Sequence, residues 1–177
     1  DMEDPNQFIA DSAKALTEDG VFVAQLMCLK NMLDSNDVGN ICHEHLEYYS
    51  FKSLEYLFNK NGLDIFDVEI NNVNGGSYRI YAKKIGSEDI ETDGAVERVQ
   101  AVRETEKDLE NKQVHIDFFE RLEDNKRKCV TFIKKEVSEG KKVWVYGAST
   151  KGNVILQYYG LDHTLIEAAA ERSPWKW

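Results

Sequence analysis

The alternation of hydrophobic and polar residues divides the chain into three segments of different texture. In residues 1–84, short apolar runs are separated by glycine- and asparagine-containing turns. Residues 85–140 are dense in Glu, Lys and Arg, and their apolar positions recur at helical spacing. From residue 141 a strand-like run returns. The pattern therefore predicts three consecutive structural regions.

The first region opens with a predicted helix and a predicted buried strand. Phe8, Ala13 and Leu16 are spaced to form the inner face of a short helix, and Gly20 follows as a stop signal. The run at residues 21–26 is short, apolar and partly β-branched, as expected for a buried strand.

A second helix and a pair of strands complete this region. Ser50 is well placed to cap a helix whose apolar face precedes Gly62. That face comprises Leu54, Leu57 and Phe58. Two strand-like runs follow, at residues 63–70 and 77–82, joined by the turn-forming residues 71–76. Because a parallel crossover needs about a dozen residues or more, these two strands are predicted to be antiparallel.

The second region is predicted to be a helical connector. It contains no proline, and its apolar residues recur at spacings of three, four and seven. This favours an amphipathic helix, preceded by another around residues 95–111, with most charges on a solvated face. The positions that recur at this spacing are His115, Phe118, Phe119, Leu122, Cys129, Phe132, Ile133 and Val137.

The third region begins a βαβ unit. A strand-like run at residues 143–146 is followed by the loop Gly147–Asn153 and then by a helical pattern that Gly160 closes. Strand, glycine-bearing loop and helix in this order are typical of doubly wound α/β folds. Since the sequence stops at Trp177, we expect a truncated Rossmann-like domain here.

Composition excludes several functional classes. The formal net charge of −10 disfavours nucleic-acid binding, because an acidic surface repels phosphate backbones. No apolar run approaches the roughly 20 residues of a membrane span, and no signal peptide is visible at the start. The three cysteines are widely spaced and predict neither a disulfide framework nor a zinc site. We expect a cytoplasmic protein that begins mid-chain, because an initiating Met is lacking.

The densest cluster of reactive side chains is the segment from Cys42 to Ser50, in which His43 and His45 flank Glu44. Three interpretations compete. A metal site needs further ligands, and none has suitable spacing. A structural loop would only hydrogen-bond the imidazoles. An acid–base site is favoured, since histidine titrates near neutrality and Glu44 can tune its neighbour.

Two glycine-containing segments are further candidates for ligand contact. In the first, Gly75, Gly76, Ser77 and Arg79 form either a simple hairpin turn or a place where a ligand approaches the backbone. The second is neither a GxGxxG nor a P-loop sequence. It is either a structural turn or a phosphate contact, since a glycine loop before a helix offers donors to an anion. Its candidate phosphate contacts are Gly147, Ser149, Thr150, Lys151, Gly152 and Asn153.

Together the three segments resemble the sugar C-methyltransferases of branched deoxysugar biosynthesis. The matching stretches are residues 43–50, 75–79 and 146–153, in the same order and at similar spacing. The resemblance implies an α/β fold. Residues 1–84 would form the end of a class I, Rossmann-like methyltransferase sheet that closes with an antiparallel strand pair. Residues 85–140 would be a helical connector and residues 141–177 the start of a second Rossmann-like domain.

The resemblance also implies a reaction. A ketone acidifies the neighbouring C–H of a nucleotide-linked keto-deoxysugar, His45 removes the proton with Glu44 beside it, and the enolate takes the methyl group of S-adenosylmethionine. His43 and the two glycine-containing segments would bind the nucleotide diphosphate sugar, which the family holds between the two domains. The alternatives are a nucleotide-sugar-binding module without catalysis and a class I methyltransferase with a non-sugar acceptor.

The chain departs from the family pattern in places. Cys42 stands where relatives usually carry Tyr, and Asn74 stands where they often carry His, so the substrate or its stereochemistry is expected to differ. The main S-adenosylmethionine loop and a small zinc-binding domain are expected upstream of Asp1. We therefore expect no metal site and no identifiable cofactor-binding residue in this chain, which should be inactive alone.

Overall fold

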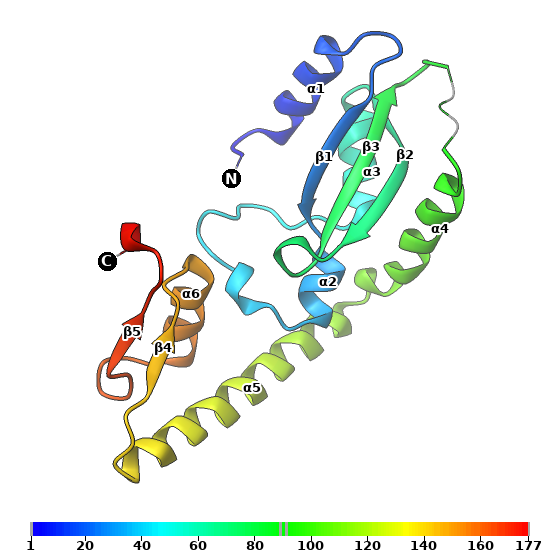
Figure 1. Ribbon diagram of the computed structural model, residues 1–177. Coiled ribbons are helices and arrows are strands. Elements are labelled where there is room, and N and C mark those ends of the chain that lie inside the picture. Colours follow the sequence, from blue (N-terminus) through cyan, green and yellow to red (C-terminus); the bar gives the residue numbers. More distant parts are fainter. Residues whose placement is uncertain (1, 89, 91, 177) are drawn as a thin grey trace. The chain divides into compact units, whose positions relative to one another are not determined.

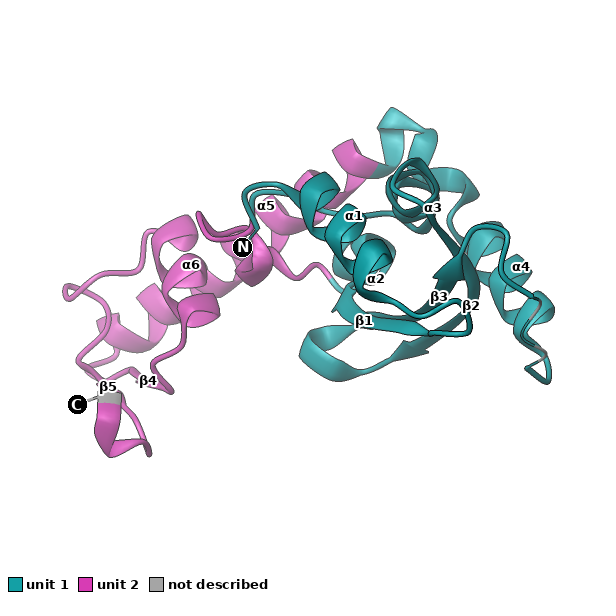
Figure 2. Ribbon diagram, turned by 90° about the horizontal axis from the view of Figure 1, so that it is seen from above, with its two compact units in different colours: residues 1–35, 46–114 teal, residues 36–45, 115–177 magenta. Residues whose placement is uncertain are grey.

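The computed structural model describes residues 2–88, 90 and 92–176, and the chain forms two compact units (Figure 2). The first unit comprises residues 1–35 and 46–114, and the second comprises residues 36–45 and 115–177. The second unit thus receives a short insertion from the first half of the chain. No helix within the described ranges combines the length and hydropathy that a bilayer span requires.

The first unit is built on a three-stranded antiparallel sheet in the order β1–β3–β2 (Figure 1). The strands are β1 (Phe22–Met27), β2 (Leu63–Asn71) and β3 (Ser77–Lys84). Strand β3 pairs with both neighbours, and its pairing with β2 contains a bulge between Ile65 and Asp67. The expected antiparallel strand pair is confirmed.

Helices α1 (Pro5–Ala15) and α3 (Phe51–Lys60) pack on this sheet. As expected, Ser50 caps α3, because its side chain accepts a hydrogen bond from the Ser53 N–H. The core contains the inward face of β3 and the apolar face of α3, and Tyr78, Phe51 and Leu54 are almost fully buried there. Short helix α2 (Leu29–Asp34) follows β1 directly.

The inner face of α1 differs from the prediction. Phe8 is 46% exposed, whereas Ile9 is buried at 4%. Ile9, Ala13 and Leu16 share one face, at spacings of four and three, and all three pack into the core. Phe8 instead makes an edge contact with Phe22, with 6.3 Å between ring centroids. Ile9, one position after Phe8, therefore faces the core in its place.

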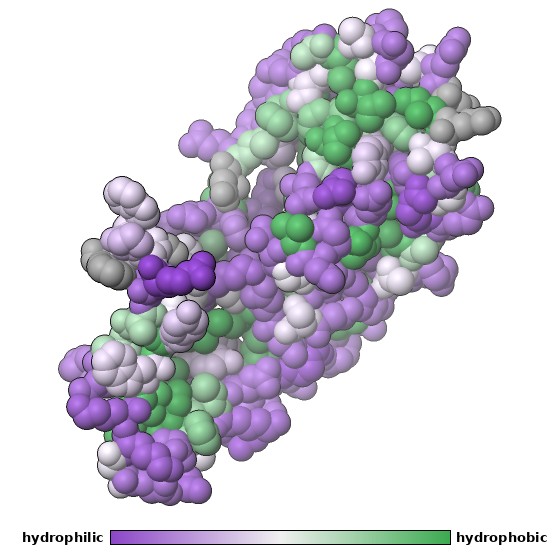
Figure 3. Space-filling model, viewed as in Figure 1, coloured by the Kyte–Doolittle hydropathy of each residue, from purple (hydrophilic) through white to green (hydrophobic). Residues whose placement is uncertain are grey.

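Apolar surface remains on the edge strand of the sheet. Figure 3 shows green apolar side chains gathered over the region of β1 and β3. Val21 and Val23, at β1, are 40% and 52% exposed. An apolar groove of about 460 Å³ runs along this strand between α1 and α3, with Phe22, Leu26 and Leu57 among its lining residues.

Helices connect the two sheets along the chain, as the periodicity predicts. They are α4 (Ala95–Thr105), a 3-10 helix at Lys107–Glu110, and α5 (Lys112–Ser138). In α5 the apolar face is only partly covered, because Phe118, Leu122 and Ile133 are buried while Phe119 and Phe132 are exposed.

The second unit contains a small βαβ arrangement. Strand β4 (Trp144–Tyr146) pairs in parallel with β5 (Ala168–Ala170), and helix α6 (Thr150–Tyr159) lies between them in sequence. Gly160 ends α6 in the left-handed region, with φ of 67°. The expected mixed α/β class and the strand–loop–helix order are thereby confirmed.

Candidate functional site

The histidine-rich segment lies between α2 and α3. It contains a 3-10 helix at Val38–Asn40 and a turn at residues 43–44, closed by a 3.1 Å hydrogen bond from the His45 N–H to the Cys42 carbonyl. His43 and Glu44 are exposed in this turn, while His45 is half-buried. The turn therefore gives the two histidines different environments.

A backbone carbonyl orients the His45 ring. Its Nδ1 lies 2.8 Å from the carbonyl oxygen of Asn40. Because a carbonyl oxygen only accepts hydrogen bonds, Nδ1 carries the hydrogen in the neutral ring. The lone pair is then on Nε2, the atom that a general base would use.

A polar network links this segment to helix α6 within the second unit. Asn40 is 3% exposed, and its Nδ2 donates to Asp37 Oδ2 at 2.8 Å. The same Asp37 oxygen accepts a 2.8 Å hydrogen bond from Lys151 Nζ. A Cβ on Gly39 would lie 2.9 Å from the Lys151 Cβ, so the two segments are in close contact. The Lys151 ammonium thus helps to fix the 3-10 helix that positions His45.

A pocket of about 480 Å³ in the second unit brings two of the predicted segments together. His43 contributes from the histidine-rich segment, and Thr150 and Asn153 contribute from the first turn of α6. The remaining lining residues are Val38, Ile41, Cys42, Phe119, Val154, Gln157 and Tyr158. Polar groups at one helix terminus and aromatic or aliphatic side chains around them are typical of small-molecule sites.

The pocket tyrosine stays protonated at neutral pH. Burial, and then its hydrogen bond to the Glu123 carboxylate, raise the pKa of Tyr158 to about 12. The phenol is therefore a neutral hydrogen-bonding group in this pocket.

Helix α6 has a capped N-terminus. The Ser149 Oγ accepts from the Gly152 N–H at 3.1 Å, and the Ser149 carbonyl accepts from the Asn153 N–H at 3.0 Å. Gly147 has a φ of 106°, which favours glycine at the end of β4. The predicted loop residues from Thr150 onward thus form the first helical turn.

The backbone donors before this helix have partners in the structure. The Gly147 N–H donates to the Ala170 carbonyl at 2.7 Å, and the Ala148 N–H donates to the Glu171 carboxylate at 2.7 Å. A carboxylate therefore already lies against one loop amide, at the end of a helix that favours negative charge. A phosphate contacting Ala148 would have to replace Glu171.

The glycine-glycine segment lies in the first unit and takes part in packing. Gly76 is buried, and its carbonyl accepts a 3.1 Å hydrogen bond from the Cys28 N–H. The Ser77 hydroxyl is buried and donates to the Val73 carbonyl at 2.9 Å. Gly75 has a φ of 89° in the same turn.

Arg79 is half-buried on the opposite face of the sheet from the core. Its guanidinium contacts Glu69 Oε2 at 3.3 Å and Gln25 Oε1 at 3.1 Å. These three side chains lie in register across β1, β3 and β2. The cation is thus paired with neighbours on the adjoining strands.

Comparison with known proteins identifies the family. The family model of the C-methyltransferase C-terminal domain matches residues 72–177, more than half of the chain. The chain belongs to this family. C-methyltransferase NovU of Streptomyces niveus is 30% identical over 170 residues, covering 96% of this chain and 40% of that protein. The chain thus spans about two fifths of the length of this curated relative, and the expected resemblance to sugar C-methyltransferases is confirmed.

Sequence reasoning missed several residues of this C-methyltransferase chain. Asp37 and Asn40 orient the His45 segment, but neither belongs to a recognisable motif, and their role depends on the 3-10 helix. Glu171 follows β5 and reaches back to the glycine loop. Gln157 and Tyr158 of α6 line the pocket. In the sequence they look like ordinary positions of an amphipathic helix. Within the described residues, no group of three His, Cys, Asp or Glu side chains could hold a metal ion.

Proposed function

We propose that this chain is the part of a cytoplasmic C-methyltransferase that binds a nucleotide-linked keto-deoxysugar and removes the proton from the carbon to be methylated. The observation that carries the proposal is the contact between His45 Nδ1 and the Asn40 carbonyl, which supports Nε2 as the atom that carries the lone pair in the neutral ring. The family and the relative's name support transfer of a methyl group to carbon.

The proposed step is the transfer of a proton from the sugar carbon beside the ketone to His45 Nε2. The electron pair of the C–H bond then becomes the enolate. Glu44, exposed beside the base, is proposed to favour the imidazolium that forms. General-base catalysis of this kind contributes about 10²–10⁴-fold to the rate.

The nucleotide sugar is proposed to occupy the pocket lined by His43, Thr150 and Asn153. The hydroxyl and amide groups at the start of α6 are suited to hydrogen-bonding phosphate or sugar oxygens, and the helix dipole favours a negative charge there. An acidic surface does not prevent this, because a local pocket can oppose the overall field. Gly147, Ser149, Gly152 and Lys151 would shape this terminus.

The residues described here do not fit a complete site for S-adenosylmethionine, which supplies the methyl group when bound. The first unit has an antiparallel sheet without a glycine-rich strand–loop–helix segment among its described residues. In the second unit, the loop after β4 is occupied by Ala170 and Glu171. We propose that the main cofactor loop lies outside the residues described here.

The test is solvent exchange of the sugar proton in D₂O by the full-length protein that contains this chain, without S-adenosylmethionine. The wild type should exchange the proton beside the ketone, and His45→Ala should lose about 10²–10⁴-fold of this rate while it still binds the nucleotide sugar. His163→Ala is the control, because His163 is an exposed histidine of the second unit.

Other results would favour the other functions. Tight binding of the nucleotide sugar without exchange or methylation in the wild type would indicate a binding module. Methylation of another acceptor without sugar exchange would indicate a methyltransferase with a non-sugar substrate. Exchange that survives in His45→Ala would exclude His45 as the base.

A further inference from the structure

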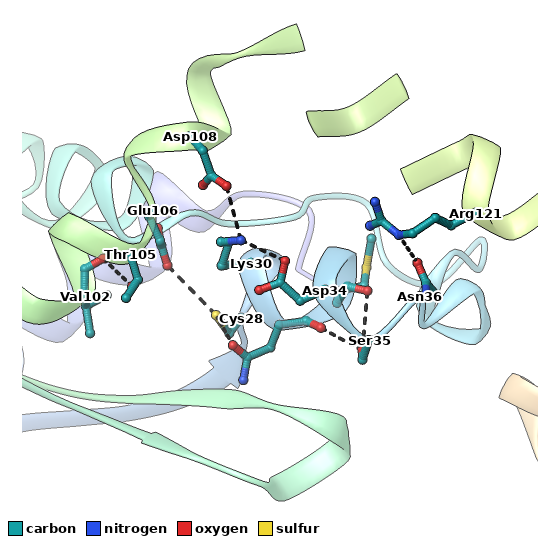
Figure 4. Close-up of polar contacts among 12 residues, drawn as sticks. Cys28, Lys30, Asp34, Ser35, Asn36, Val102, Thr105, Glu106, Asp108 and Arg121 are labelled. Carbon is teal, nitrogen blue, oxygen red and sulfur yellow. Dashed lines mark hydrogen bonds and ion pairs between the residues drawn. The ribbon is translucent and has the colours of Figure 1, made fainter. Parts of the chain in front are cut away.

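The segment that carries the proposed base belongs to the second unit and is held by contacts inside that unit. We call residues 36–45 the base segment; it groups with α5 and α6. At its start, Arg121 Nε of α5 donates to Asn36 Oδ1 at 2.8 Å (Figure 4). Near its end, His43 lines the pocket two residues before His45. The base and the pocket are therefore arranged by residues of one unit.

Asn40, whose carbonyl contacts the His45 ring, is itself fixed by several hydrogen bonds. The carbonyl lies 2.8 Å from His45 Nδ1 and also accepts from the Cys42 N–H at 3.1 Å. The Asn40 side-chain Nδ2 donates to Asp37 Oδ2 at 2.8 Å, and the Asn40 N–H donates to the Asp37 carbonyl at 3.4 Å. Because Asn40 is 3% exposed, removal of the Asp37 carboxylate would cost a buried amide one of its hydrogen bonds.

One carboxylate oxygen joins this arrangement to helix α6. Asp37 Oδ2 accepts from Asn40 Nδ2 and from Lys151 Nζ, each at 2.8 Å. The Asp37 side chain is 21% exposed, so solvent screens this ion pair less than it screens a fully exposed one. Hydrogen bonds to an ionised acceptor are also stronger than neutral ones. Asp37 thus connects the residue that orients the base to the first turn of α6.

The backbone of the base segment also lies directly against this turn. A Cβ built on Gly39 would lie 2.9 Å from the Lys151 Cβ and 3.3 Å from its Cα. A side chain at residue 39 would therefore push the base segment away from α6. The same turn of α6 contributes Thr150 and Asn153 to the pocket. It therefore contacts the pocket through these two residues and the base segment through Lys151.

We infer that Asp37 is a positioning residue for the proposed base: it fixes Asn40, whose carbonyl orients His45, and ties them to the turn of α6 that lines the pocket. The inference rests on the proposed function of His45. It also gives Lys151 a role other than the phosphate contact expected from the sequence, because its ammonium holds the Asp37 carboxylate. A base displaced by about 1 Å loses on the order of 100-fold in rate, so this link matters for proton abstraction.

The orientation of the base has a spectroscopic signature that does not depend on turnover. A hydrogen bond from His45 Nδ1–H to the Asn40 carbonyl keeps the lone pair of the neutral ring on Nε2. The ¹⁵N chemical shifts of the ring show which nitrogen carries the hydrogen. Wild type should show the Nδ1–H tautomer alone. Asp37→Ala should show both tautomers, because Asn40 is then free to move.

The test compares Asp37→Ala, Asp37→Asn and Gly39→Ala with Lys142→Met. Asn keeps the side-chain length and an oxygen that accepts from Asn40 Nδ2. Gly39→Ala separates the base segment from α6 without removing a polar group. Lys142→Met is the matched control, because Lys142 forms a 2.7 Å ion pair with Glu167 in the same unit but does not line the pocket. The readouts are the His45 tautomer in this chain and sugar-proton exchange by the full-length protein.

In Asp37→Ala, kcat for sugar-proton exchange should fall by about 10–100-fold, with KM for the nucleotide sugar within about threefold of wild type. Asp37→Asn should keep the single tautomer and restore most of the exchange rate. Gly39→Ala should also slow exchange, and Lys142→Met should change neither readout.

Lys151→Met separates the two roles of this lysine. If the ammonium holds Asp37, Lys151→Met should slow exchange without raising KM. The double variant Asp37→Ala/Lys151→Met should then be no slower than Asp37→Ala, since both changes remove the same link. If the ammonium instead contacts the diphosphate, Lys151→Met should raise KM by about tenfold or more, and its effect should add to that of Asp37→Ala. The second pattern would overturn the inference.

Three outcomes separate this inference from the proposed function. If wild type exchanges the proton and His45→Ala does not, while Asp37→Ala matches wild type in rate and tautomer, the inference alone fails. It also fails if Asp37→Ala slows exchange but leaves the His45 tautomer unchanged, because Asp37 then has only a structural role. If wild type shows no exchange, the proposed function fails and the inference falls with it.

Discussion

Replacement of Gly76 by Ala tests whether the glycine-glycine segment serves packing or ligand binding. Gly76 has a φ of 133°, a conformation that L-residues rarely adopt. A Cβ built there would lie 2.5 Å from the Asn31 Cβ and 2.8 Å from its Cγ. The methyl group therefore meets the backbone-proximal part of α2, which cannot rotate away.

The expected cost has two parts. An alanine forced to a positive φ loses roughly 1–2 kcal/mol, and overpacking by one methyl group adds roughly 1–3 kcal/mol. The free energy of unfolding should thus fall by about 2–5 kcal/mol in Gly76→Ala. Gly86 is the matched control, since its φ is 89° and a Cβ there meets nothing within 4 Å. Gly86→Ala should bear only the backbone part, about 1–2 kcal/mol.

Urea unfolding of both variants, followed by far-ultraviolet circular dichroism, measures this difference. Equal destabilisation of Gly76→Ala and Gly86→Ala would refute the packing argument. If Gly76 instead approaches a ligand, its replacement should raise KM for the nucleotide sugar in the full-length protein and leave stability at the level of the Gly86 control. The two roles therefore give opposite patterns.

Two further predictions concern buried carboxyl groups. Asp67 is 3% exposed and accepts hydrogen bonds from Arg98 Nε and Nη2 at 2.8 and 2.6 Å. Replacement of Arg98 by Met should therefore lower the free energy of unfolding by about 2–3 kcal/mol. Arg103 is more exposed, so an equal or larger loss in Arg103→Met would contradict this prediction. Burial raises the pKa of the Glu106 carboxyl above its usual 4.5, although its hydrogen bonds lower that pKa. The stabilisation that comes from the protonated carboxyl is therefore complete below pH 4.5, and it is lost as the pH rises through the folded-state pKa. Urea titrations at several pH values should show wild type losing stability relative to Glu106→Gln above pH 4.5, and a pH-independent difference would exclude this linkage.

Local signals explain the elements that could be predicted. Ser50 and Ser149 cap their helices because a short side chain with an acceptor oxygen satisfies the first free amides. Gly62 and Gly160 take positive φ after helices, where glycine has no steric penalty. The short turn before Ser77 allowed only an antiparallel pair. These features depend on residues within a few positions of each other.

Features that depend on the three-dimensional fold could not be predicted from the sequence. Whether Phe8 or Ile9 faces the core depends on where the sheet lies, since the two are adjacent and both are apolar. Asn40 acts through its backbone carbonyl, and any residue offers that group, so its side chain gives no signal. Glu106 is one of many acidic residues in a charged helical segment and becomes distinct only because the fold buries it.

The division of the chain into units gives the proposed chemistry a physical rationale. Residues 36–45 belong to the same unit as α6. The elements that precede and follow them in the sequence, α2 and α3, belong to the other unit. The pair between Lys151 and Asp37, and the close contact of Gly39 with Lys151, hold this insertion against the start of α6. In the proposed reaction, the base and the groups that bind the sugar are therefore parts of one unit. Their relative placement then depends on contacts inside that unit, and catalysis does not require the base to be carried to the substrate by another domain.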